Sequence, residues 1–138
     1  MSSGIVVSTE CKVKFEQLKL RKSYKYIIFK LTADFSQIVI DKTAENSTYD
    51  DFLEELPENQ PRYAVYDFDY EKPGEGQRSK VIFFAWTPDT SNTRHKMIYT
   101  SSKDALRREL VGASIEIQGT DFSEVDYETV LDKALRTN

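Results

Sequence analysis

Few side chains in this sequence could carry covalent chemistry. The 138 residues contain one cysteine, Cys11, and one histidine, His95, so a nucleophilic Cys–His pair would require these two residues to meet. The same scarcity excludes a His-rich or Cys-rich metal site and a disulfide framework. Gly74 and Gly76 lie in a turn-rich segment without the following helix that phosphate binding needs. The sequence therefore predicts no metal and no cofactor.

Acidic residues are plentiful, and the pair Asp67 and Asp69 is spaced to lie on one face of a strand. Paired carboxyl groups act as acid and base only in a pocket that shifts their pKa values. On a strand, this spacing more often marks the side that faces water. We therefore expect the protein not to be an enzyme.

The elements that position these residues follow from the spacing of apolar side chains. Strands are predicted at 24–31, 37–41, 62–70, 78–86 and 113–118, and helices from Ser8, at 48–56, at 91–112 and from Ser123. This order favours an α/β (mixed α+β) fold with one central mixed sheet and helices on both of its faces. Residues 1–7 are expected to form a flexible tail and residues 8–138 a single domain.

The predicted helix 91–112 is the segment around which we organise the chain. At 100° per residue, its largely apolar half contains Ile98, Tyr99, Ser102, Ala105, Leu106, Glu109 and Leu110. Its other half contains Lys96, Met97, Ser101, Lys103, Asp104, Arg107 and Arg108. Methionine has no use on a solvated face but fills irregular gaps at interfaces, where arginine is also common. The pattern is compatible with a surface that binds another protein, although such charge runs are more often ordinary solvated helix faces.

Charge is distributed unevenly along the chain, although the net charge is only −4. The segment 94–108 carries five lysines and arginines opposed only by Asp104, whereas 116–132 carries six acids and no cation before Lys133. A basic patch on an acidic protein favours a particular acidic partner, either a protein or a phospholipid headgroup, over general binding to nucleic acid. The opening residues MSSGIVVSTECK do not have the pattern of a signal peptide, and a reducing, cytosolic setting is expected.

Four strings carry a resemblance that extends over nearly the whole chain: YAVYDFDY, RSKVIFFAWTPDT, RHKMIYTSSKDALRREL and QGTDFSEVDYETVL. With them the chain resembles the actin-depolymerising factor/cofilin family, and most of all its fungal members. The resemblance implies an actin-depolymerising-factor homology domain. It also implies binding to monomeric and filamentous actin, preferentially the ADP form, and severing and depolymerisation of filaments without covalent chemistry.

The same resemblance implies two binding surfaces. The residues implied to contact both monomers and filaments are Ser3, Gly4, Arg94, Lys96, Met97, Lys103, Asp104, Arg107 and Arg108. The residues implied to contact filaments only are Arg78, Lys80, Asp132, Lys133 and Arg136. Ser3 matches the regulatory phosphoserine of the family, although the preceding Ser2 leaves the choice of site open. The residues implied to bind phosphoinositides are Lys96, Lys103, Arg107 and Arg108.

The remaining expectations concern partners and location. The resemblance implies actin, phosphoinositide headgroups and cofilin-assisting actin regulators as partners of a monomer. It implies the cytoplasm, the actin cytoskeleton and cortical actin patches as the location, and no basic run supports nuclear entry. His95 replaces a residue that is commonly small in the family, which fits either a mild pH sensitivity or an idle surface histidine. A non-severing binder of coactosin or twinfilin type and a phosphoinositide-binding module are the alternatives.

Overall fold

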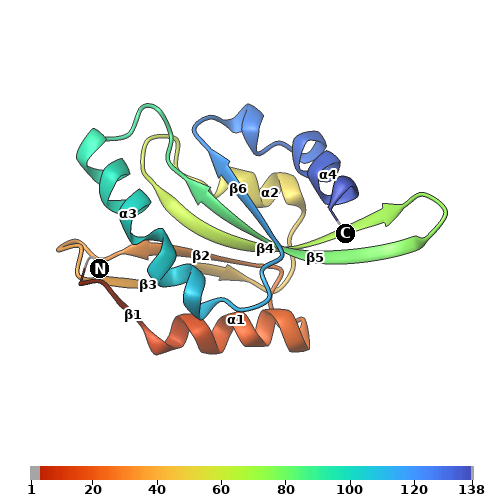
Figure 1. Ribbon diagram of the computed structural model, residues 1–138, viewed down its shortest axis with the longest axis horizontal. Helices are drawn as coiled ribbons and strands as arrows, with labels where there is room; N and C mark the ends of the chain where they lie inside the picture. Colours follow the sequence, from red (N-terminus) through yellow and green to blue (C-terminus); the bar gives the residue numbers. More distant parts are fainter. Residues whose placement is uncertain (1–3, 138) are drawn as a thin grey trace.

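The computed structural model describes residues 4–137, which form one six-stranded mixed sheet with helices on both faces (Figure 1). The strands are β1 (Val6–Val7), β2 (Tyr26–Leu31), β3 (Gln37–Ala44), β4 (Arg62–Lys72), β5 (Gly76–Trp86) and β6 (Ile115–Gly119). The helices are α1 (Thr9–Arg21), α2 (Tyr49–Glu54), α3 (Thr93–Glu109) and α4 (Tyr127–Arg136), with a 3-10 turn, η1 (Phe122–Glu124), before α4. The predicted fold class is confirmed.

The sheet has the order β1-β3-β2-β4-β5-β6, in which β1 pairs parallel with β3, β6 pairs parallel with β5, and the other neighbours are antiparallel. Alternate residues of each strand point to opposite faces, so two cores form. One core lies under α1 and α3 and contains Phe29, Val65 and Phe83. The other lies under α2 and α4 and contains Phe52, Tyr66 and Phe84.

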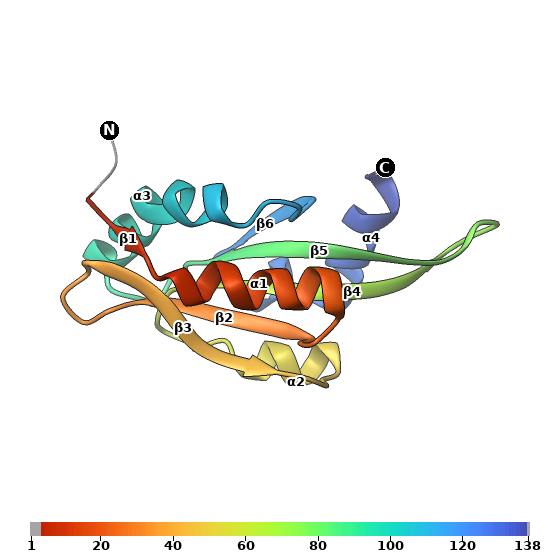
Figure 2. The ribbon, with the colours of Figure 1, turned by 90° about the horizontal axis from the view of Figure 1, so that it is seen from below.

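The β4–β5 hairpin contains the two longest strands of the sheet. Its register runs from Arg62 opposite Trp86 to Lys72 opposite Gly76, and residues 81–86 are buried, as their continuous apolar run predicts. The tip of the hairpin projects beyond the helices (Figures 1 and 2). Polar side chains at this tip are therefore held away from the body of the domain.

Helix α3 is shorter than predicted at both ends. It begins after Asn92, whose side-chain oxygen accepts a hydrogen bond from the His95 N–H at 3.1 Å, and Leu110, rather than Gly112, is its C-terminal cap residue. Tyr99, Ser102, Leu106 and Leu110 are buried as predicted, whereas Glu109 is exposed. The hydroxyl of Tyr99 accepts a hydrogen bond from the Leu31 N–H at 2.9 Å, which fixes the helix to β2.

One expectation for the chain before α1 is wrong. Val6 and Val7, predicted to lie in a flexible tail, form β1 and pair with Gln37 and Ile38 of β3. A segment of two residues is too short to show the alternation of polar and apolar side chains that predicts a strand. It becomes a strand because it pairs with the edge of β3. Ser8 then accepts a hydrogen bond from the Glu10 N–H and caps α1, as predicted.

Of the two neighbouring acids on β4, Asp67 and Asp69, only Asp69 faces water. Asp69 is exposed, but Asp67 is buried because Lys22, the left-handed residue that ends α1, lies over it with its Nζ 3.0 Å from Asp67 Oδ2. Asp69 pairs separately with Lys25 at 2.9 Å. Each carboxylate is thus bound to its own lysine, an arrangement that stabilises the fold and leaves no acid/base pair.

Candidate protein-binding surfaces

The exposed side of α3, with the chain that precedes β1, is the first candidate surface. We define the α3 surface as the predicted residues that the structure describes: Gly4, Arg94, Lys96, Met97, Lys103, Asp104, Arg107 and Arg108. β1 contacts α3 along one side of the domain (Figure 2). Ser3 lies outside the described residues.

Met97 is the apolar centre of the α3 surface. The residue is 66% exposed, and Asp104 and Arg108 on the same side of the helix are exposed as well. A large apolar side chain in this position loses its water when a partner docks, which is favourable by about 1.5–3 kcal/mol for full burial. The structure therefore presents Met97 as the sequence pattern predicted.

The N-terminal turns of α3 hold Arg94 and Lys96. The guanidinium carbon of Arg94 lies 5.7 Å from the centroid of the Phe35 ring, and His95 packs on the same ring with centroids 5.1 Å apart. Lys96 donates to the Asp89 carbonyl at 3.4 Å. Neither cation has a carboxylate partner within residues 4–137, so both positive charges are available to an acidic partner.

The C-terminal turns of α3 differ, because Lys103 and Arg107 are bound to one acid. Lys103 Nζ lies 2.7 Å from Glu116 Oε2, and Arg107 Nε lies 3.2 Å from Glu116 Oε1. Burial disfavours a charged Glu116, but hydrogen bonds from Lys103 and Gln118 and the nearby positive charges outweigh it, so the pKa of Glu116 is lowered. Sequence reasoning did not connect Glu116 with these two cations, because only the packing of α3 over β6 brings them together.

The second candidate surface, here called the hairpin surface, consists of Arg78, Lys80, Asp132, Lys133 and Arg136. Of the residues on β5, Lys80 contacts α4: its Nζ donates to the carbonyls of Ala134 and Thr137 at the end of that helix. Arg136 pairs with Asp132 one turn earlier. Lys80 therefore also serves the fold, since it satisfies carbonyl groups that a helix C-terminus leaves unpaired.

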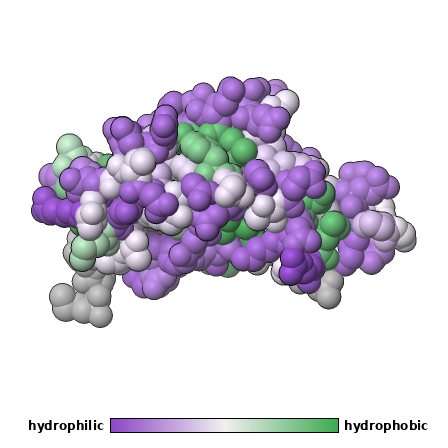
Figure 3. Space-filling model, turned by 90° about the horizontal axis from the view of Figure 1, so that it is seen from above, coloured by the Kyte–Doolittle hydropathy of each residue, from purple (hydrophilic) through white to green (hydrophobic). Residues whose placement is uncertain are grey.

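The two surfaces are predominantly polar. Figure 3 shows one side of the molecule, on which hydrophobic side chains form small patches between hydrophilic ones. Within residues 4–137, no helix is long and apolar enough to cross a membrane. The same part of the chain contains no group of three His, Cys, Asp or Glu side chains that could hold a metal ion.

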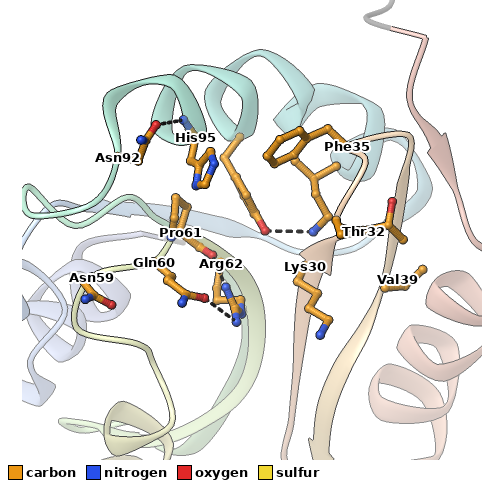
Figure 4. A pocket seen from close by; sticks show the side chains of 13 residues that line it. Lys30, Thr32, Phe35, Val39, Asn59, Gln60, Pro61, Arg62, Asn92 and His95 are labelled. Atoms are coloured by element: carbon orange, nitrogen blue, oxygen red, sulfur yellow. Dashed lines mark hydrogen bonds between the residues drawn. The ribbon is translucent and has the colours of Figure 1, made fainter.

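A cavity of about 820 Å³ opens between the start of α3, the β2–β3 turn and the segment before β4 (Figure 4). Its cations Lys30 and Arg62 both pair with Asp41, at 3.6 and 3.0 Å. His95 and Phe35 lie together at its rim. No thiol or carboxylate lines this cavity.

Cys11 and His95 do not form a catalytic pair. Cys11 is fully buried on the inner face of α1, and its thiol donates to the Ile38 carbonyl at 3.6 Å, whereas His95 lies against Phe35. Burial raises the pKa of the Cys11 thiol to about 12, so the reactive thiolate is not populated near neutral pH.

This burial leads to a direct prediction. The native protein should show no thiol reactive with Ellman's reagent over minutes at pH 8, and one thiol after unfolding in guanidinium chloride. A stoichiometric reaction of the native protein would contradict the buried position of Cys11.

An exposed methionine among cations, carried by a helix on a covered sheet, is compatible with a surface that binds another protein. Comparisons with known proteins define the class further. Residues 4–135 match the family model described as cofilin/tropomyosin-type actin-binding protein. The chain belongs to this actin-depolymerising factor/cofilin family.

Individual relatives agree over almost the full length. The chain is 56% identical to cofilin of Mycosarcoma maydis over 99% of both chains, and 53% identical to cofilin of Saccharomyces cerevisiae over 97% of this chain and 94% of that one. The crystal structure of Streptomyces griseoflavus cofilin superposes with a TM-score of 0.92 at 48% identity, covering 98% of this chain and 100% of that one. The predicted family and fold are confirmed.

Proposed function

We propose that this protein binds monomeric and filamentous actin, prefers the ADP form, and severs and depolymerises filaments. The observation that carries the proposal is the full-length match to the cofilin family together with the exposed Met97 between cations on α3. The protein acts by binding and without turnover, as a regulator of actin filament dynamics.

The α3 surface supplies the contact with an actin monomer in this proposal. Met97 enters an apolar cleft, and Arg94 and Lys96 steer the protein onto acidic actin and remain as anchors around the cleft. Ser3, which precedes β1 in the chain, is the proposed site of regulatory phosphorylation. A phosphate would add about −1.5 to −2 charges beside the cations of the α3 surface and oppose docking.

The hairpin surface supplies a second contact that only a filament offers. Two actin subunits along a strand are then held by one molecule, and linked contacts increase the affinity beyond that of either alone. We propose that this double contact changes the twist of the decorated filament. Breaks then arise where decorated and bare lengths meet.

Regulation and location complete the proposal. The cations Lys96, Lys103, Arg107 and Arg108 also bind phosphoinositide headgroups, which makes a membrane a competitor of actin. We expect a monomer in the cytoplasm at the actin cytoskeleton, concentrated in cortical actin patches and assisted by other actin regulators. Co-sedimentation with ADP-actin filaments tests the main claim, and binding to phosphoinositide vesicles without any binding to actin would contradict it.

The division into two surfaces is tested best by Arg78→Ala. The Arg78 side chain is 45% exposed and its pair with Glu75 at 3.4 Å is a surface contact of little energetic value, so the fold should be unaffected. We expect filament affinity to fall about 5- to 30-fold, for the loss of roughly 1–2 kcal/mol, while monomer affinity stays within about twofold. Pelleting assays and the fluorescence of labelled actin monomers measure the two affinities.

Lys80→Ala gives a different result because Lys80 also caps α4. We expect the same loss of filament affinity, with an additional fall of about 1–2 kcal/mol in the free energy of unfolding. The double variant of Arg78 and Lys80 should still bind monomers. An equal loss of monomer and filament binding would refute the separation of the two surfaces.

A further inference from the structure

Glu116 holds two cations of the α3 surface in fixed positions. It lies on the edge strand β6, on the sheet face that α3 covers, and its side chain is 24% exposed. One carboxylate oxygen accepts from Lys103 at 2.7 Å and from Gln118 Nε2 at 3.1 Å, and the other lies 3.2 Å from Arg107 Nε. Both oxygens are therefore engaged with groups of this chain.

Arg107 is held on three sides. Its guanidinium carbon lies 5.1 Å from the centroid of the Phe83 ring, Nη1 donates to the Ala113 carbonyl at 3.4 Å, and Nε faces Glu116. The side chains of Arg107 and Lys103 are only 29% and 19% exposed. Because these contacts already restrain both side chains in the free protein, binding of a partner should cost little further side-chain entropy.

The cations of the α3 surface thus fall into two kinds. Lys103 and Arg107 are fixed and share one negative charge, whereas Arg94, Lys96 and Arg108 have no carboxylate partner in the described part of the chain. Lys133 of α4 donates to the Glu116 backbone carbonyl at 3.0 Å. This hydrogen bond attaches β6, the strand that carries Glu116, to α4.

From this geometry we propose, on the basis of the proposed function, that Glu116 is a positioning residue of the α3 surface that favours actin over phosphorylated lipid. It presents Lys103 and Arg107 in the one arrangement that a shaped protein surface can use. At the same time its negative charge weakens the attraction of these cations for a phosphoinositide headgroup.

The two ligands respond differently because they impose different demands. Docking on a folded protein requires side chains in defined places, so pre-organisation contributes to affinity. A layer of mobile headgroups imposes no such geometry and responds mainly to how much positive charge the contacting cations leave uncompensated, by about fivefold in affinity for each lysine or arginine near the membrane. Loss of the Glu116 charge should therefore move the two affinities in opposite directions.

The decisive variant is Glu116→Gln, which keeps the shape of the side chain and removes its charge. We expect binding to phosphatidylcholine vesicles containing phosphatidylinositol bisphosphate to strengthen about fivefold, as measured by sedimentation. Binding to ADP-actin monomers should weaken about fivefold in the same buffer. Urea denaturation establishes that the variant is folded.

Glu109→Gln is the matched control. Glu109 is exposed at the end of the same helix, and its replacement changes the net charge equally without touching Lys103 or Arg107. We expect both affinities of this variant to stay within about twofold of the starting protein. An equal gain in vesicle binding by both variants would reduce the effect to net charge and overturn the proposal.

Glu116→Asp provides the second variant, because it keeps the charge but shortens the reach to the two cations. Vesicle binding should remain at the starting level, while actin affinity falls part of the way. A gain in vesicle binding equal to that of the glutamine variant, or unchanged actin binding in both, would also overturn the role of Glu116. If the unmodified protein fails to bind actin, the proposed function fails, and the positioning role fails with it.

Discussion

Replacing Arg94 and Lys96 together by alanine should lower the affinity for actin monomers about 100-fold and weaken filament binding as well. Each side chain is placed to contribute roughly 1–2 kcal/mol as a charged anchor at the edge of a buried contact. Both lie in the first turns of α3, on either side of His95, and Met97 follows directly. The loss should appear with both actin forms, because both are proposed to bind the α3 surface.

The fold should tolerate this double change. The guanidinium of Arg94 lies over Phe35, and Lys96 makes a long hydrogen bond to the Asp89 carbonyl, but no carboxylate is left without its partner. The cap of α3 by Asn92 and the bond from the Leu31 N–H to Tyr99 remain. We expect the free energy of unfolding to change by less than about 1 kcal/mol.

Arg21→Ala with Lys42→Ala is the matched control, since it removes the same charge elsewhere. Arg21 is exposed at the end of α1, and Lys42 pairs with Glu55 beside α2. Fluorescence titration of labelled ADP-actin measures all the affinities. If the control variant lost as much affinity as the α3 variant, general electrostatic steering would explain the result and the assigned contact would be wrong.

Phe52→Ala should have the largest effect on stability, a loss of about 3–5 kcal/mol. Phe52 of α2 is fully buried, and its ring centroid lies 4.9 Å from that of Tyr66 and 5.2 Å from those of Tyr26 and Phe84. These rings come from three different strands, which cannot all move to fill the space. The loss is a large part of the 5–15 kcal/mol typical of a domain of this size.

Urea denaturation followed by tryptophan fluorescence measures this loss, because Trp86 is the one tryptophan and is buried. Glu54→Ala, an exposed change on the same helix, is the control and should change the stability by less than about 0.5 kcal/mol. The folded fraction of the Phe52 variant should still bind actin, since α2 covers the sheet face opposite to α3. A cost below about 1 kcal/mol would show that this core is not packed as described.

Periodicity was sufficient to predict the elements that bury a continuous apolar face. Tyr99, Ser102 and Leu106 face the sheet, and the strand 81–86 is covered on both faces, as their spacing indicated. β1 could not be predicted in this way, because a strand of two residues has no period and depends on the edge of β3.

The pairing of charges was the part that the sequence did not reveal. Lys103 and Arg107 were expected as available cations of a basic patch, but both bind Glu116, which lies nine or more residues further along the chain. Lys80 was expected at a binding surface and also caps α4. These contacts depend on how α3 and α4 lie over the sheet, and no spacing along the chain determines that.

The central claim, that the protein severs actin filaments, is tested most directly by imaging labelled ADP-actin filaments in real time. The protein is added in amounts below one molecule per actin subunit, and breaks along the filaments are counted. We predict breaks throughout the filament length, and fewer breaks with Arg78→Ala. Decoration without breaks would indicate a non-severing binder of coactosin or twinfilin type, and filaments that stay bare and intact would contradict actin binding altogether.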